Sequence, residues 1–229
     1  MKKIYLLIFL LFLGIIYGQN KNPNKLLDAV RQKFDKIKDY EVDVTVKVDI
    51  NFVKVPETKA KIYFKQPDKQ TIKSEGFAML PKQSLNFSPT KLLKGDYNSI
   101  YVKSEMVNNE KLDVLKIIPS NDSTDVILST LWIDPILNVI KKIQTTGKKS
   151  GTIQVLLDYK NEAIALPTNV KFTFNVGDMN LPRNIPDDNK NTNGERHKEK
   201  GPVMGSVILT YSNYKINMGI PDSFFDEKK

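Results

Sequence analysis

The sequence of 229 residues contains no cysteine. Disulfide bonds, thiolate metal ligands and a cysteine nucleophile are therefore excluded. The absence also removes the lipidated cysteine that a bacterial lipoprotein carries after its leader. A chain of this length can bury a core large enough to fold without covalent cross-links. We therefore expect a fold that is stabilised by burial and hydrogen bonding alone.

Histidine is nearly as scarce, because His197 is the only one. It lies in a stretch rich in Asn, Asp and Lys, where a side chain is normally solvated. A Ser-His-Asp triad needs its histidine held in place by the surrounding structure. The sequence also lacks a Gly-x-Ser-x-Gly motif. It therefore predicts no catalytic residues, and we expect a protein that is not an enzyme.

Three short patterns match functional motifs only in part. Gly147-Lys148-Lys149-Ser150 lacks the upstream glycine of a phosphate-binding loop, and it lies between predicted strands rather than before a helix. Residues 189–194 resemble half of a calcium loop, but Lys200 occupies the twelfth position. Asp187-Asp188 lies beside a run of basic residues, so an acid–base pair is not indicated. We predict a hairpin turn for the first pattern and solvated loop for the others, with no metal and no cofactor.

Arginine is also rare, and the lysines are scattered along the chain. Aromatic residues are spread through the predicted strands rather than gathered on a basic face, so the sequence predicts no nucleic-acid partner. The formal charge is +9, and it becomes +7 when Lys2 and Lys3 are removed with a leader. This charge favours solubility, and it is also compatible with transient contact with an anionic membrane surface.

The first 18 residues have the pattern of a secretory signal peptide. Two lysines follow the first methionine, an apolar run extends from Ile4 to Ile16, and Gly18 supplies a small residue for cleavage. The apolar run is shorter than the roughly 20 residues needed to span a bilayer. We therefore predict a signal peptide at 1–18 and a single domain at 19–229, because no later change in composition divides the chain.

The longest regular pattern lies between Tyr40 and Val55. Apolar residues occupy the even positions from Val42 to Phe52, and polar or charged residues fill the odd positions between them. A period of two predicts a strand with one buried and one solvated face, and β-branched residues strengthen this prediction. If the odd-numbered face were the buried one, every assignment on this strand would fail.

The remaining pattern predicts a mostly β protein with a helix at its start. Asn22 and Pro23 suit a helix start, and the apolar residues from Leu26 to Ile37 fall on one stripe. A short second helix is expected around Leu92 and Leu93. The strands that follow residues 40–55 are predicted at 60–64, 69–77, 98–107, 111–119, 126–133, 138–146, 152–159, 169–176 and 203–216, with a flexible polar loop at 177–202.

The order of these segments resembles a known family. Pro67-Asp68-Lys69 joins two strands, residues 115–119 precede Leu131-Trp132-Ile133-Asp134, and a hairpin at 138–157 follows. The chain then ends with Tyr211–Asn217 and Phe224-Phe225. Together with the leader, the helix and the long strand, this order resembles the LolA-like outer-membrane lipoprotein-sorting proteins of Gram-negative bacteria. The ending is similar to a branch often found in Bacteroidetes-type genomes, and the resemblance covers most of residues 22–225.

The resemblance implies an α+β, mostly β fold. It consists of a curved antiparallel sheet that forms an incomplete barrel, with an N-terminal helix and a short helical lid over the concave face. It also implies a periplasmic carrier whose hydrophobic cavity receives the acyl chains of lipoproteins, or of a lipid, for transfer to the outer membrane. An inner-membrane donor protein and an outer-membrane acceptor protein are the partners that this implies. The side chains expected to line the cavity are Val44, Val46, Val48, Ile50, Phe64, Ile72, Leu92 and Leu93.

The chain departs from the family pattern in two ways. In the family an arginine on an early strand helps to hold the lid closed, whereas the arginines here are Arg31, Arg183 and Arg196. The long loop at 177–202 is also additional to the family pattern. Two other interpretations therefore stay open. One is an envelope binding or sensing module that contacts a protein partner, and the other is a structural envelope protein with a fully packed core. A connected apolar cavity of several hundred Å³ distinguishes the carrier from both.

Overall fold

The computed structural model of the protein describes residues 21–50, 55–74, 93, 95–121, 124–160, 163–175 and 204–226. The predicted signal peptide at 1–18 and the predicted polar loop at 177–202 lie outside the described residues, and so does Leu92. Within the described part of the chain, no helix is both long and apolar enough to cross a membrane.

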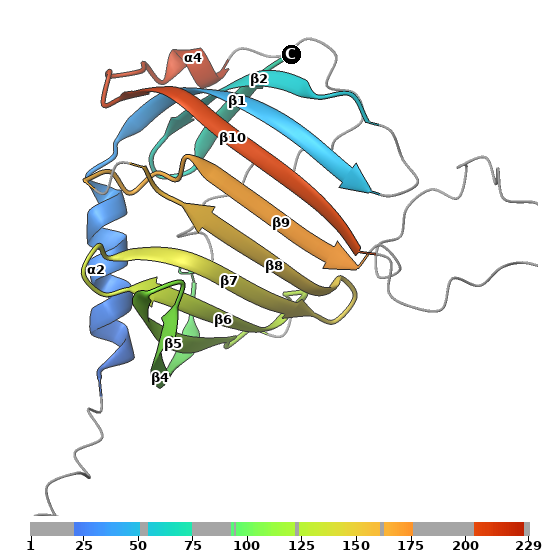
Figure 1. The fold of residues 1–229 in the computed structure, drawn as a ribbon. Coiled ribbons are helices and arrows are strands. Elements are labelled where there is room, and N and C mark those ends of the chain that lie inside the picture. Colours follow the sequence, from blue (N-terminus) through green and yellow to red (C-terminus); the bar gives the residue numbers. More distant parts are fainter. Residues whose placement is uncertain are drawn as a thin grey trace, which may run out of the picture.

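Ten strands form one antiparallel sheet that does not close on itself (Figure 1). The strand order is β3-β2-β1-β10-β9-β8-β7-β6-β5-β4, so β3 and β4 are the two edges. The predicted incomplete barrel is therefore confirmed. The strands are β1 (Asp39–Ile50), β2 (Thr58–Lys65), β3 (Lys69–Lys73), β4 (Tyr97–Val107), β5 (Glu110–Pro119), β6 (Val126–Asp134), β7 (Val139–Gly147), β8 (Gly151–Asp158), β9 (Asn169–Asn175) and β10 (Met204–Ile216).

The even-numbered face of β1 lies inside the curve of the sheet. Val42, Val44 and Val46 are fully buried, whereas the odd-numbered Lys47 and Asp49 are exposed. This is the predicted phase, and it follows from the alternation of side chains along a strand. The strand is shorter than predicted, because it ends at Ile50 and the chain at Val55 is no longer in a strand. Residues 51–54 lie outside the described residues.

Local turn chemistry sets two of the hairpins. Asn108 and Asn109 join β4 to β5, and both have a positive φ, at 50° and 66°. Asparagine tolerates this left-handed region, and a two-residue turn of this kind matches the twist of the flanking strands. Asp134 ends β6, and its carboxylate accepts hydrogen bonds from the backbone N–H groups of Ile136 and Leu137 at 2.8 and 2.9 Å.

Helix α2 (Pro23–Asp35) begins at the predicted cap. The side-chain oxygen of Asn22 accepts hydrogen bonds from the backbone N–H groups of Asn24 and Lys25, and proline occupies the first helical turn. Such a cap satisfies donors that have no partner inside the helix. The buried residues Leu27, Val30 and Phe34 follow the helical spacing and face the sheet. In Figure 1, α2 stands beside the ends of the central strands.

A second short helix, α4 (Ser223–Asp226), was not predicted. Its Phe224 ring lies 4.6 Å from the Tyr63 ring, between centroids, on the outer face of β2. The segment before it is held by Asp39, whose carboxylate accepts hydrogen bonds from the backbone N–H groups of Met218 and Gly219 at 2.7 and 3.0 Å. Asp39 is buried, so this contact fixes the C-terminal segment against the start of β1.

Candidate functional site

The concave face of the sheet carries one continuous apolar cluster. Its members are Leu93 and residues from α2 and from all strands except β3 and β4, and partly buried side chains of those two strands pack against it. Most of the predicted cavity residues belong here. Val44, Val46 and Leu93 lie within the cluster, and Val48, Ile50 and Ile72 pack against it as half-buried residues.

Phe64 differs from the other predicted residues because it belongs to a separate cluster. It packs with Phe34 and Ile37, and its ring stacks on Tyr40 with the centroids 5.1 Å apart. This second cluster joins the C-terminal end of α2 to the start of β1. Phe64 therefore closes the end of the barrel where α2 meets the sheet, apart from the main concave cluster.

Helix α2 is tied to the concave face at its first residues. Lys21 lies just before the helix, and its ammonium is 2.8 Å from both carboxylate oxygens of Asp113 on β5. The Asp113 side chain is fully buried. It also accepts a hydrogen bond of 2.6 Å from the Ser104 hydroxyl on β4. A buried carboxylate requires such partners, so Lys21 fixes the position of the helix start.

Arg31 connects the middle of α2 to the segment that precedes β4. Its guanidinium donates a hydrogen bond of 2.7 Å to the Leu93 carbonyl, and it also donates to the Tyr97 hydroxyl. The guanidinium carbon lies 5.5 Å from the centre of the Tyr97 ring. The structure thus places an arginine on the helix itself, where it holds the Leu93 backbone. The sequence showed only that no arginine lies on an early strand.

Tyrosines form a part of the concave face that the sequence analysis did not single out. The centroid of the Tyr214 ring lies 5.8 Å from that of Tyr40 and 6.1 Å from that of Tyr211, and all three rings pack against the main cluster. Burial raises the pKa of each of these phenols. The Tyr214 hydroxyl donates to the Pro167 carbonyl at 2.8 Å. Tyr40 is in phase with the even-numbered apolar residues of β1, so the alternation could have predicted its place on the concave face.

A hollow of about 1000 Å³ opens on the other side of the sheet, over β1, β2 and β10. Of the predicted cavity residues, only Val44 borders it. Polar and charged side chains dominate its wall, including Asp43, Lys61 and Ser212. Lys61 lies 2.7 Å from Asp43 and 2.9 Å from Glu41, and its hydrogen bonds lower the pKa of both carboxyls. This hollow suits a polar partner rather than an acyl chain.

No group of three or more His, Asp or Glu side chains among the described residues is arranged to hold a metal ion. The buried Asp113 is neutralised by Lys21 rather than left open for a cation. The described residues of the concave face are mostly apolar, with tyrosine hydroxyl groups and the guanidinium of Arg31 at its margin.

Comparison with solved structures identifies the fold. An outer membrane lipoprotein-sorting protein domain from Vibrio parahaemolyticus superposes with a TM-score of 0.58 and 11% sequence identity, covering 90% of this chain and 98% of that one. A DUF1329 family protein from Desulfovibrio piger gives 0.56 and 14%, covering 90% and 98% of the two chains. A LolA superfamily protein from Nitrosomonas europaea gives 0.53 and 12%, covering 90% and 97%.

This chain has the LolA-like fold. The resemblance inferred from the sequence is thus confirmed at the level of the fold, with the similarity extending over nearly the whole length of each structure. No family model matches the sequence, and no curated protein matches it either. The same fold is therefore formed at very low sequence identity, which is possible because burial patterns tolerate many different apolar residues.

Proposed function

We propose that this protein is a non-enzymatic periplasmic carrier that holds the acyl chains of a lipoprotein or lipid against its concave face for transfer to the outer membrane. The observation that supports this most strongly is the LolA-like sheet that does not close on itself, whose buried concave cluster is bordered by half-buried apolar side chains such as Val48 and Ile50. The description of the Vibrio parahaemolyticus neighbour as a lipoprotein-sorting domain supports the same function. Under this proposal, an inner-membrane donor and an outer-membrane acceptor are the partners.

The physical basis is transfer of hydrocarbon out of water. Each methylene that moves from water to an apolar surface contributes about 0.8 kcal/mol. Val48, Ile50 and Ile72 are half-buried at the margin of the concave cluster, and an acyl chain that covered them would bury their remaining apolar surface. Helix α2 covers part of the same face, so its movement would change the surface that cargo can reach.

The test is a comparison of two substitutions on neighbouring positions of β1. Ile50→Gln places an amide on the concave side, whereas Asp49→Gln places the same side chain on the exposed side. The first variant is expected to weaken binding of a fluorescent fatty acid, because burying an amide without a partner is unfavourable. The second is expected to bind like the parent protein. Unfolding by urea shows whether both variants remain folded.

Native mass spectrometry of protein extracted from the periplasm identifies the cargo directly. Co-purification of a lipid or lipoprotein is the expected result. Equal fatty-acid affinity of the Ile50→Gln and Asp49→Gln variants, together with extraction free of lipid, would overturn the proposal.

One observation favours a second candidate, an envelope module that binds a protein partner. The hollow over β1, β2 and β10 is polar and lies on the side opposite to the concave face. A stable protein complex that is lost when Ser212 and Thr45 in this hollow are replaced by Lys, with no bound lipid, would favour that candidate.

A further inference from the structure

The convex face of the sheet carries a row of lysines and apolar residues that crosses eight strands. Strand registers place these side chains opposite one another in succession, although they are far apart in the sequence. We call this set the convex row: Lys47, Ile208, Lys171, Leu156, Lys142, Trp132, Val114 and Lys103. Ile208, Leu156 and Trp132 point away from the concave cluster, because both neighbours of each along its strand are buried. Val114 is itself buried, and Lys103 follows a bulge in β4.

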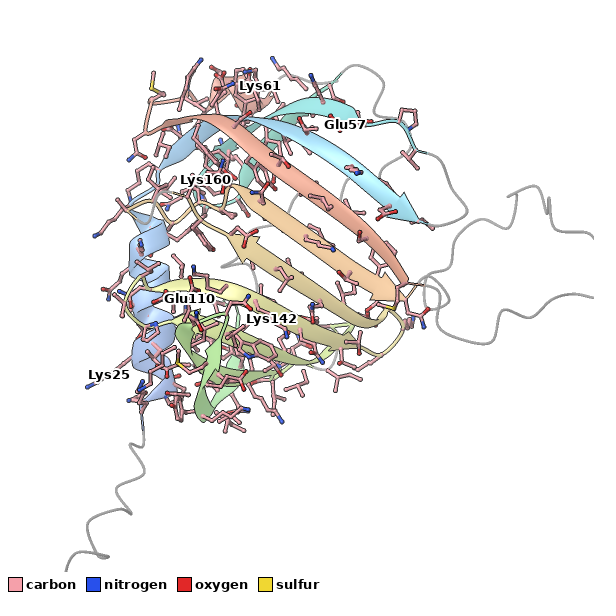
Figure 2. The ribbon with its side chains drawn as sticks, viewed as in Figure 1. Lys25, Glu57, Lys61, Glu110, Lys142 and Lys160 are labelled. Carbon is pink, nitrogen blue, oxygen red and sulfur yellow. The ribbon has the colours of Figure 1, made fainter. Side chains whose placement is uncertain are left out.

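The lysines of the convex row are regularly spaced. Adjacent strands lie about 4.8 Å apart. Because one strand separates Lys47 from Lys171, and one separates Lys171 from Lys142, these lysines follow each other at about 10 Å along the sheet. Lys47 and Lys171 are exposed, and the described structure shows no ion pair for either of them. Figure 2 shows Lys142 on β7.

One of the two rows that flank the convex row carries no charge over its central strands. Between β10 and β6 it consists of uncharged polar residues, namely Ser206, Thr173, Gln154, Gln144 and Thr130. Glu105 is the acidic group beside the β4 end of the convex row. It pairs with Lys103 and accepts a hydrogen bond from the indole N–H of Trp132. Asp49 on β1 and Asp158 on β8 are further carboxylates on this face, and Glu105 also interacts electrostatically with Lys142. Neither Lys171 nor Lys142 forms an ion pair among the described residues, so both ammonium groups stay available to a partner.

Apolar side chains alternate with these lysines. Leu156 is 37% exposed between Lys171 and Lys142. Trp132 is half-buried, and the Lys142 ammonium lies 4.2 Å from the centre of its ring. Tryptophan favours the boundary between headgroups and acyl chains, and lysines beside it can reach lipid phosphates. An acidic protein surface could form ion pairs with the lysines, but it would offer no apolar contacts to Leu156 and the Trp132 indole.

We infer that the convex row is a docking surface for membranes that contain anionic phospholipid. The sheet is curved, so its centre, with Lys171, Leu156, Lys142 and Trp132, meets a flat bilayer first. Lys47 and Lys103 approach the bilayer from either side. This surface does not rest on the proposed cargo, because the concave face is free to hold or release a lipid while the convex face is docked. The protein stripped of lipid is therefore expected to dock equally well.

The test measures co-sedimentation of the mature protein with phosphatidylcholine vesicles, with and without phosphatidylglycerol. Binding is expected only with phosphatidylglycerol, and it is expected to fall as salt rises. The double variant K142Q/K171Q is expected to bind about 25-fold more weakly, from about fivefold for each lysine. Because Lys142 contacts Trp132, the variant K47Q/K171Q serves as a second test that leaves the indole untouched.

A matched control removes the same charge elsewhere. Lys25 and Lys160 are exposed and lie away from Lys142 in Figure 2, so K25Q/K160Q is expected to lose less than about twofold in affinity. Trp132 is the only tryptophan in the chain, which makes its fluorescence a reporter of this surface. Its emission is expected to shift to shorter wavelength on phosphatidylglycerol vesicles and to be quenched by brominated acyl chains.

Three results would overturn the inference. The first is the absence of phosphatidylglycerol-dependent binding at low salt. The second is an equal loss of binding in K25Q/K160Q and K142Q/K171Q, which would mean that net charge alone attracts the protein. The third is binding without any change at Trp132. Binding to polyglutamate without binding to vesicles would assign the convex row to an acidic protein instead.

Discussion

At the scale of single residues, Asp113 has the strongest requirement for a partner. Its carboxylate is fully buried, and Lys21 supplies the neutralising charge from outside the sheet. Removing one member of such a pair leaves an uncompensated buried charge, whereas removing both does not. The pair therefore anchors α2 to β5 mainly because breaking it would leave a buried, unpaired carboxylate. The net contribution of the attraction between Lys21 and Asp113 is smaller.

Lys21→Met is expected to lower the free energy of unfolding by about 2–3 kcal/mol, because Asp113 would stay buried without its cation. The double variant Lys21→Met with Asp113→Leu is expected to regain most of that loss. Urea unfolding measures both. Lys25→Met, on an exposed position of the same segment, is the control, with an expected change within about 0.5 kcal/mol. A double variant less stable than Lys21→Met would contradict this account.

Arg31 holds the backbone at Leu93 through a hydrogen bond and contacts Tyr97. Arg31→Met is expected to destabilise the protein by about 1–2 kcal/mol and to speed amide hydrogen exchange around residues 93–97. Tyr97→Phe keeps the bond to the carbonyl, so its effect on exchange is expected to be smaller. Asp28→Asn removes only an exposed ion pair of the same arginine and serves as control. Unchanged exchange in Arg31→Met would argue against this role.

At the scale of secondary-structure elements, β1 shows how a local pattern fixes a face. Val44 is buried, whereas the adjacent Thr45 is partly exposed on the convex side. A slip of one residue would exchange the two faces, so the register is strongly specified. The alternation therefore explains why Val44 and Val46 lie in the concave cluster. It does not show which other strands pack beside β1.

Replacing Val44 by Thr and Thr45 by Val tests which face of β1 is buried, because valine and threonine side chains have nearly equal volumes. Val44→Thr is expected to lower the free energy of unfolding by about 1–3 kcal/mol, because it buries a hydroxyl group. Thr45→Val is expected to change it by less than about 0.5 kcal/mol. Urea denaturation of both variants measures the difference. An equal loss from both would show that the odd-numbered face is also enclosed.

At the scale of the whole molecule, charged side chains from strands that are distant in the sequence form ion pairs with one another. Lys61 on β2 and Lys215 on β10 both approach Glu41 on β1, and Lys61 also contacts Asp43. These hydrogen bonds hold the pKa of Glu41 and of Asp43 below the ordinary value. A depressed folded-state pKa contributes stability above the unfolded pKa, and this stability is lost as pH falls through the folded value.

The free energy of unfolding is therefore expected to fall on acidification below about pH 4, as these carboxylates are protonated. Lys61→Met is expected to make this fall shallower, because the carboxylates lose the partner that lowers their pKa. The contribution of each ion pair is modest, since these side chains are partly exposed. Urea unfolding over a series of pH values measures the slope. Lys59→Met, on an exposed position of the same strand, is expected to keep the parent slope.

Much of the fold and part of the site could be predicted from local sequence. The cap at Asn22, the turn at Asn108-Asn109 and the alternation of β1 each depend on residues a few positions apart, and all three are present in the structure. Helix α4 was missed because it is only four residues long. The segment before it is held by a hydrogen bond to Asp39, which lies 179 residues before Met218 in the sequence.

By itself, the sequence determined which face of β1 is apolar, where the first helix begins and that cysteine chemistry plays no part. These properties follow from the side-chain period along one strand or helix, and so they are local. Only the tertiary structure decided that β1 lies beside β10, that Lys21 reaches Asp113, and that lysines of four strands align on the convex face. Such contacts depend on strand order and register, which the pairing of distant segments fixes only when the whole sheet forms.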